Sequence, residues 1–531
     1  MRTHLLRWTI GWVLAAFLIL VNASAAAAPK NILFVLADDF GLDTLSLFNT
    51  NTGPDIDLPA TPTINALAQN GVLFRNCYTF PSCSPTRASI LTGRYGFRNG
   101  VGAAIGFVGD PVLSPREFTI AKALSANPQL GFRHAHIGKW HCSTNAIDPN
   151  FIGGWNHFAG FIGAEHESHY DWAKTVNGVT TPHVTNWATT EIATDAINWI
   201  NAQGTNRWFL WFAPKSAHSP YDKPPNELHS YDNLPFNRPA IVPEKPYFHA
   251  AIEALDTELR RVLTNVNLAE TMVVFMTDNG TPGEVIQGPY DTNHCKGSLT
   301  EGGTRVPLIF AGAGIVGTNR TSDAVIHAVD LFATLLEFAG VNLATTLPTN
   351  LVFDSRSFAN VVRNEPWNPA ENVILMENFG TIIPAQYWGV AARGQRYKVV
   401  KLDNGREEFY DLQTDPFETN SLLGMPPNLN NLTATQRVVY AGLTNRLAQW
   451  HNPPIAPTIT RWETQLGALT LTVPEQLGIA YEVARVNSVE ATNWTTVTTF
   501  VREVRTNIAE ITLSVPVPAA IRFYRVTAAG R

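Results

Sequence analysis

Short, almost entirely apolar runs alternate with helical stretches from about Lys30 to Gly340. The apolar runs include NILFVLA (31–37), RWFLWFA (207–213), TMVVFMT (271–277) and VPLIFAG (306–312). Strands that are buried on both faces have this continuous pattern, because helices cover both sides of a mostly parallel sheet. Helical stretches such as 189–202 lie between the runs. The pattern therefore predicts an α/β fold, with a large mostly parallel sheet sandwiched by helices.

The pattern changes after about Glu371. Four shorter strands are expected at 372–378, 387–394, 396–402 and 407–412, followed by a helix at 433–451, which together indicate a smaller α+β subdomain. A Pro-rich stretch then precedes β-branched and aromatic runs typical of a small all-β module. The expected organisation is a signal peptide (1–28), a catalytic domain (29–370), a C-terminal subdomain (371–453) and an accessory β-sandwich module (454–531).

The N-terminal segment has the pattern of a secretory signal. Arg2 and Arg7 precede the apolar run Trp8 to Val21, and the small-residue tract NASAAAAPK follows it. The alternative is a membrane anchor, but the run is short for a span of about 20 residues. We expect a chain that is secreted or periplasmic and has no membrane association once the signal is cleaved.

Composition limits the classes of partner. The chain has 531 residues, too many for one ordinary core, and its net charge of −6 gives no basic footprint for nucleic acid. An anionic ligand would need a local cluster of positive side chains. The four cysteines, Cys77, Cys83, Cys142 and Cys295, are too few for a disulfide framework. A bridge between Cys142 and Cys295 is left open.

Carboxylates follow two of the apolar runs directly. The first run ends in Asp38 and Asp39, and the third ends in Asp278 and Asn279. Parallel strands would bring these side chains to one edge of the sheet, where ligands bind in such folds. Clustered carboxylates need a cation or raised pKa values, and an all-oxygen set suits Ca²⁺ or Mg²⁺, with Ca²⁺ favoured by a flexible cage. Helix N-capping is the alternative for either pair alone.

Basic side chains are expected at the same edge. Lys139 and His141 follow a strand-like stretch, His218 follows the second run, and Lys296 precedes the fourth. A single His or Lys is more often structural or solvated. Their shared position at strand ends instead favours an oxyanion pocket, to which Arg87 also contributes.

Several motifs together resemble the formylglycine-dependent sulfatase family, which is arylsulfatase-like and belongs to the alkaline phosphatase superfamily. CSPTRASILTGR (83–94) is similar to its C-x-P-x-R signature with the T-G-R stop. LADDFG, GKWH, MTDNG, KGSLTEGGTRVPLIF, HAVDLFATLLEFAGV and GREEFYDLQTDPFETNSLL are similar to its other blocks, in the same order. The resemblance runs from about Lys30 to His451. Without these motifs, Cys83 could be read as a small apolar core residue.

The resemblance implies that a separate maturation enzyme oxidises Cys83 to Cα-formylglycine. An aldehyde hydrate has two hydroxyls, of which one attacks sulfur and the other later expels sulfate by reforming C=O. Cys83 would lie at a helix N-terminus, where backbone N–H groups and the helix dipole favour an anion. Pro85 and Arg87 in the first turn fit this position.

The resemblance also implies roles for the other site residues. One Ca²⁺ would be held by an oxygen of the modified Cys83 and by Asp38, Asp39, Asp278 and Asn279. Arg87 and Lys139 would hold the hydrate, and His141 would take the proton that lets the covalent sulfate leave. Sulfate would be bound by Lys139, His218 and Lys296, with His218 the better candidate to protonate the departing alcohol. Cys142 after His141, and AHSP in place of PHxP, depart from the family pattern.

The implied activity is hydrolysis of a sulfate ester, expected to be that of a sulfated carbohydrate. One alternative is a phosphonate monoester or phosphodiester hydrolase of the same superfamily, which can use the same nucleophile and metal cage. Another is a non-catalytic, sugar-binding relative. Every candidate catalytic residue type is present, which argues against the second alternative.

Overall fold

The computed structural model describes residues 28–106, 112–144, 147–163, 168–349, 351–368, 372–379 and 388–450, together with the backbone of six strands beyond residue 460. Nearly all of the expected signal peptide and the Pro-rich stretch 451–460 lie outside the described residues. In the part that the structure describes, no helix has the length and apolar character needed to cross a membrane.

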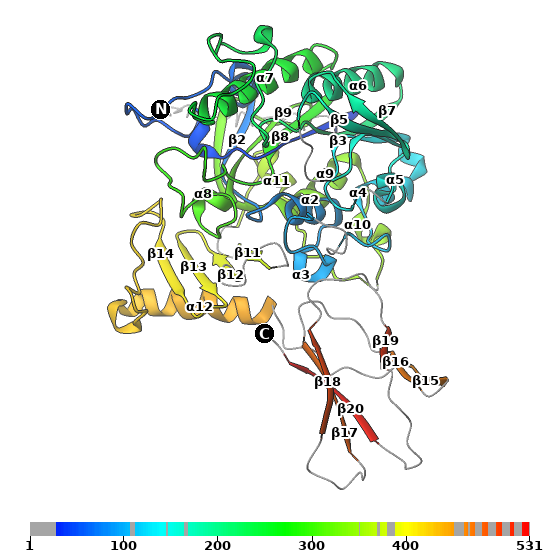
Figure 1. The fold of residues 1–531 in the computed structure, drawn as a ribbon, viewed down its shortest axis with the longest axis vertical. Helices are drawn as coiled ribbons and strands as arrows, with labels where there is room; N and C mark the ends of the chain where they lie inside the picture. The colour runs from blue at the N-terminus through cyan, green and yellow to red at the C-terminus, as the bar shows by residue number, and fades with distance from the viewer. Residues whose placement is uncertain are drawn as a thin grey trace, which may run out of the picture.

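A ten-stranded sheet forms the centre of the large domain (Figure 1), with strand order β10-β2-β9-β8-β1-β7-β3-β4-β5-β6. Its middle strands, β8, β1, β7, β3 and β4, are all parallel to one another. The large, mostly parallel sheet predicted from the apolar runs is therefore confirmed. The strands are β1 (Asn31–Ala37), β2 (Gly71–Tyr78), β3 (Phe132–Lys139), β4 (His157–Phe161), β5 (Trp172–Val176), β6 (Val179–Val184), β7 (Arg207–Ala213), β8 (Thr271–Thr277), β9 (Arg305–Gly312) and β10 (Arg320–His327).

Strand β9 runs against its neighbours, antiparallel to both β8 and β2. Its apolar run does not reveal this direction, because a buried strand has the same composition either way. The direction matters for the site, because β9 begins at the edge where β1, β7 and β8 end. Residues that precede β9 along the chain, Lys296 among them, therefore lie at that edge.

Helices cover both faces of the sheet, and β1 shows how the layers are separated. Ile32, Phe34 and Leu36 pack into one core with α2, α4 and α9, whereas Leu33 and Val35 pack into the other with α1, α6 and α7. Successive side chains of a strand point to opposite faces, so a fully apolar strand supplies both cores. The covering helices are α1 (Pro62–Gln69), α2 (Cys83–Thr92), α4 (Ile120–Ser125), α6 (Ala188–Ala202), α7 (Lys245–Leu263) and α9 (Leu331–Ala339).

A second, antiparallel sheet of four strands forms the C-terminal subdomain, as predicted. It consists of β11 (Ile374–Asn378), β12 (Gly389–Arg393), β13 (Tyr397–Leu402) and β14 (Glu407–Asp411), and it packs on α12 (Ala434–Trp450). The shorter helices of the chain are α3 (Gly96–Asn99), α5 (Pro149–Gly153), α8 (Glu301–Thr304), α10 (Leu343–Thr346) and α11 (Ala359–Val362).

Buried charges join this subdomain to the large domain. The Lys398 ammonium, on β13, lies 2.9 Å from a carboxylate oxygen of Glu418 and 3.3 Å from one of Glu301, which begins α8. The Glu301 carboxylate also accepts a hydrogen bond of 2.9 Å from the Tyr78 hydroxyl. All four side chains are buried, so each charge depends on its partner across the junction.

Beyond residue 460, the backbone forms two antiparallel sheets of three strands each, in the orders β15-β16-β19 and β18-β17-β20. The strands are β15 (Arg461–Gln465), β16 (Ala468–Thr472), β17 (Ala480–Val486), β18 (Thr495–Val501), β19 (Glu510–Leu513) and β20 (Phe523–Ala529). Five of them coincide with predicted runs, and β15 was not predicted. Packing of the two sheets into a sandwich, and the proposed domain boundaries, stay predictions.

Candidate active site

Four parallel strands end at one edge of the sheet and place the candidate residues there. β1 ends next to Asp38 and Asp39, β8 next to Asp278, and β3 ends at Lys139 itself. β1 lies between β8 and β7, and β3 is the next strand along. The structure thus brings together residues that lie as much as 257 positions apart in the sequence, such as Asp39 and Lys296.

Helix α2 begins at Cys83, and all ten of its residues are buried. It ends at Gly93, whose φ of 67° is left-handed, and a Cβ there would lie 2.5 Å from the Phe332 ring. Gly93, the glycine of the T-G-R motif, is therefore the C-cap of α2, and the Phe332 ring leaves no room for a side chain there. Cys83 is 1% exposed, and its Sγ lies 3.6 Å from one oxygen each of Asp38 and Asp39, either of which can accept its hydrogen.

Three buried carboxylates pair with three cations around this thiol. Arg87 donates twice to Asp278 Oδ2, at 3.0 and 2.7 Å. The Lys139 ammonium lies 2.6 Å from Asp38 Oδ2, and that of Lys296 lies 2.6 Å from both oxygens of Asp39. Burial alone would raise the pKa of Asp38, but the positive charges of Lys139 and Arg87 hold it well below its ordinary value.

The side chains present fit a divalent cation. One ligand atom from each of Asp38, Asp39, Cys83 and His218 lies within 4.8 Å of the others. Asn279 donates through Nδ2 to Asp39 Oδ1 at 2.9 Å, while its Oδ1 is buried and has no hydrogen-bond partner among the described residues. A buried amide oxygen beside clustered carboxylates is a donor set suited to Ca²⁺. Asp39 also has a φ of 64°, which a non-glycine residue adopts only when its surroundings enforce it.

His141 is held with one ring nitrogen free to accept a proton. Its Nε2 lies 3.0 Å from the Ile105 carbonyl oxygen. Because a carbonyl only accepts, Nε2 carries the hydrogen, and Nδ1 is left with a lone pair, buried and without a partner among the described residues. Burial and the positive charges of Lys139 and Arg87 keep the pKa of His141 well below its ordinary value. The Ile105 N–H in turn donates to Ser84 Oγ at 3.0 Å.

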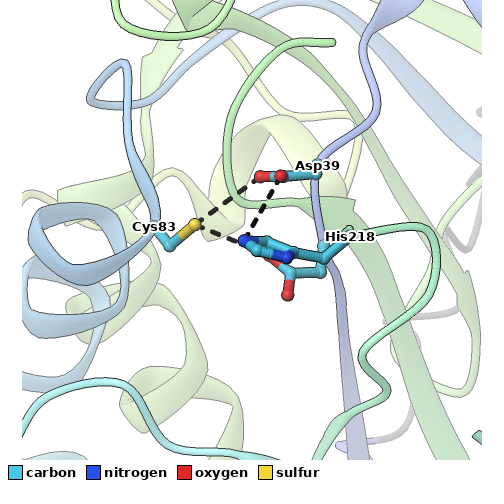
Figure 2. A group of neighbouring side chains, drawn as sticks. Asp39, Cys83 and His218 are labelled. Carbon is cyan, nitrogen blue, oxygen red and sulfur yellow. Dashed lines mark hydrogen bonds and ion pairs between the residues drawn. The ribbon is translucent and has the colours of Figure 1, made fainter. Parts of the chain in front are cut away.

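His218 faces the same point from the loop after β7. Figure 2 shows that its ring points toward the Cys83 thiol and the Asp39 carboxylate. Its Nδ1 donates to the Ser219 carbonyl at 2.7 Å, and Nε2 lies 3.5 Å from Asp39 Oδ2. Burial, followed by the charge of Lys139, lowers the pKa of His218 to about 3. The free ring is therefore neutral at physiological pH.

His169, which was not among the predicted site residues, supports His218. Its Nε2 lies 3.1 Å from the His218 carbonyl oxygen, and its ring stacks on Trp187 with centroids 4.5 Å apart. The contact is made to a backbone group, so no motif spacing indicates it.

The possible Cys142–Cys295 bridge does not form, since all four cysteines are free and buried. Cys295 instead donates to the Thr292 carbonyl at 3.1 Å.

Comparison with known proteins agrees with this arrangement. The sulfatase family model matches residues 30–341. A protein named sulfatase from Formosa agariphila is 27% identical, over 82% of this chain and 90% of its own length. N-acetylglucosamine-6-O-sulfatase from Bacteroides thetaiotaomicron is 24% identical, over 74% and 82%. The crystal structure of Ps i-CgsB in complex with k-i-k-neocarrahexaose shares the fold, with a TM-score of 0.65 and 21% identity over 80% of this chain and 92% of that one.

The family match covers more than half of the chain and includes each candidate residue at the sheet edge. The aligned regions cover most of each relative's length, so the similarity extends beyond one motif. This chain belongs to the sulfatase family and is a sulfuric ester hydrolase.

Proposed function

We propose that the chain is a secreted or periplasmic sulfatase that removes sulfate from a sulfated carbohydrate, using Cys83 in its formylglycine form and one Ca²⁺. The observation that carries the proposal is the position of Cys83. Its side chain lies at a helix N-terminus, between two carboxylates and within 3.6 Å of the Lys139 ammonium. Relatives named N-acetylglucosamine-6-O-sulfatase and ulvan-active sulfatase support a carbohydrate substrate.

The modified Cys83, once hydrated, would supply the hydroxyl nucleophile that a thiol cannot replace. Lys139 would then stabilise that side chain, and Arg87 would hold Lys139 in place. The Lys139 ammonium lies beside the atom that would become oxygen, and can donate to it and stabilise negative charge. Arg87 donates to the Lys139 carbonyl at 2.8 Å as well as to Asp278, so it fixes both the cation and the carboxylate.

The cation would be held by Asp38, Asp39, Asp278, Asn279 and an oxygen of the modified Cys83, and when bound it would supply positive charge to the sulfate group. Asn279 Oδ1, which has no hydrogen-bond partner among the residues that the structure describes, best supports this assignment. Lys296 would bind the sulfate, since its ammonium lies within the same site, beside Asp39.

Two histidines would move the protons. His141 has the bare Nδ1 that a base requires, and its donated Nε2–H fixes the orientation of the ring. His218 is neutral when the site is free. A bound sulfate ester would add negative charge beside His218 and so favour its protonated form. The proton on Nε2 can then be transferred to the oxygen of the departing alcohol. Binding of the substrate thus prepares the acid.

The test is mass spectrometry of the peptide that contains Cys83, combined with hydrolysis of 4-nitrophenyl sulfate. A chain produced with a maturation enzyme should carry the aldehyde and hydrolyse the ester, and Cys83→Ala should abolish turnover. Full activity with unmodified Cys83 would refute the proposal. Faster turnover of an aryl phosphodiester than of the sulfate would indicate the alternative hydrolase activity, and a modified chain that turns over neither ester would indicate a binding protein.

A further inference from the structure

Tyr221 and Glu284 lie on the two loops that flank the end of β1. Tyr221 follows His218 in the loop after β7, and Glu284 lies between Asn279 and Lys296 in the segment after β8. β1 is the strand between β7 and β8. The Tyr221 hydroxyl donates to Glu284 Oε1 at 3.0 Å. This hydrogen bond therefore joins the two loops beside β1, the strand that Asp38 follows.

The tyrosine is fixed, whereas the carboxylate is open to solvent. The Tyr221 ring is 8% exposed and packs edge-to-face on Phe248 of α7, with centroids 5.8 Å apart. Burial and the nearby carboxylates of Glu284 and Asp39 raise the pKa of Tyr221, so the phenol remains a donor. Glu284 is exposed. A rigid phenol near Asp39 thus orients one carboxylate oxygen of Glu284, while the residue stays open to solvent.

Glu284 differs from the carboxylates inside the site in having no cation beside it. Inside the site, Lys139 pairs with Asp38, and Lys296 pairs with Asp39. Glu284 makes no ion pair with any residue that the structure describes, and it accepts a hydrogen bond from Tyr221. An unpaired carboxylate accepts hydrogen bonds from sugar hydroxyls. It also repels a second anion at this position.

We propose that Tyr221 and Glu284 form a binding subsite for the hydroxyl groups of the sugar that carries the scissile sulfate. The ligand of this subsite is an uncharged sugar unit. Units with a second sulfate or a carboxylate next to the scissile ester bind poorly. The inference rests on the proposed sulfatase activity and specifies its substrate class.

The experiment compares kcat/KM for three substrate types. They are 4-nitrophenyl sulfate, a panel of monosulfated neutral hexoses, and the same hexoses with a second sulfate on the adjacent carbon. In the mature full chain, Glu284→Gln should reduce kcat/KM for the preferred monosulfated hexose roughly tenfold more than for the aryl sulfate, mostly through KM, since a hydrogen bond to a charged group is lost. Tyr221→Phe should act in the same direction. Glu284→Lys should raise the disulfated-to-monosulfated ratio at least tenfold.

Tyr440→Phe is the matched control, because Tyr440 forms a similar phenol–carboxylate pair with Glu407 in the C-terminal subdomain. It should leave all three rates unchanged. Equal losses on hexose and aryl sulfate, an unchanged ratio in Glu284→Lys, or a wild type that prefers the disulfated sugar or turns over neither sugar would each overturn the subsite. Failure of the wild type on every substrate, the aryl sulfate included, would refute the proposed function itself.

Discussion

Glu377, on β11, should make the stability of the protein fall as pH rises. One of its oxygens accepts the Phe97 N–H at 3.0 Å, and the other is buried without a hydrogen-bond partner among the described residues. Burial raises the pKa of Glu377 from its ordinary value of 4.5 to about 8. The folded protein therefore keeps a proton on Glu377 between these two pH values, whereas the unfolded chain releases it.

The sign and size of the effect follow from this difference. Where the folded state holds the extra proton, stability decreases by about 1.4 kcal/mol for each pH unit. Between pH 5.5 and 7.5 the loss is roughly 3 kcal/mol, which corresponds to about 3–4 °C in Tm for a folded unit of about 400 residues. Above pH 8 the carboxyl is ionised in both states, and the slope from this residue ends.

The assay is thermal unfolding of wild type and Glu377→Gln at half-unit steps from pH 5 to 9. The amide cannot ionise, so Tm of the variant minus Tm of wild type should grow with pH up to about 8 and then level off. Glu365→Gln, at an exposed carboxyl, is the control and should follow wild type at every pH. Parallel curves for wild type and Glu377→Gln would show that Glu377 is ionised in the folded protein and that the reasoning is wrong.

Three further predictions concern the proposed metal site, the Gly93 C-cap of α2 and the proposed proton donor His218. Asp38→Ala should abolish Ca²⁺ binding in calorimetry and lower turnover by at least about a thousandfold, while circular dichroism stays native; Ca²⁺-independent, chelator-resistant turnover would contradict the site. Gly93→Ala should lower stability by at least roughly 2 kcal/mol more than Gly131→Ala, because both glycines have left-handed φ but only Gly93 has Phe332 within 4 Å of a new Cβ; equal Tm losses would rule out the clash. His218→Ala should harm sugar sulfates more than 4-nitrophenyl sulfate, whose leaving group needs little protonation; equal losses would indicate sulfate binding only.

The sequence was sufficient for four central strands of the large sheet and for the edge at which the candidate residues meet. Continuous apolar runs predicted β1, β7, β8 and β9, and the carboxylates that follow β1 and β8 had to share an edge once those two strands were parallel. The direction of β9 could not be predicted in this way. A strand that is buried on both faces is apolar throughout, so it lacks the apolar–polar alternation that is typical of antiparallel strands with one face in solvent. Lys296 reaches the site only because that strand runs antiparallel.

The fine geometry of the site depends on backbone partners that no motif specifies. His141 is oriented by the carbonyl of Ile105, and His218 by the imidazole of His169 acting on its carbonyl. The pairing of Tyr221 with Glu284 joins two loops of irregular structure. Each contact depends on how separate loops meet in space, and a single sequence does not contain that information.

The buried charges between the two domains set a boundary for engineering. Glu301 lies in the short segment between Lys296 and β9, and its carboxylate is neutralised by Lys398 from the neighbouring subdomain. Replacing that subdomain with one that lacks this lysine would leave Glu301 with only the Arg305 guanidinium, 3.6 Å away, at a cost of up to roughly 3–5 kcal/mol. Chimeras that exchange specificity between sulfatases should therefore be joined after α12, which ends at Trp450. A junction near residue 370 would separate Lys398 from Glu301 and is expected to yield an inactive protein.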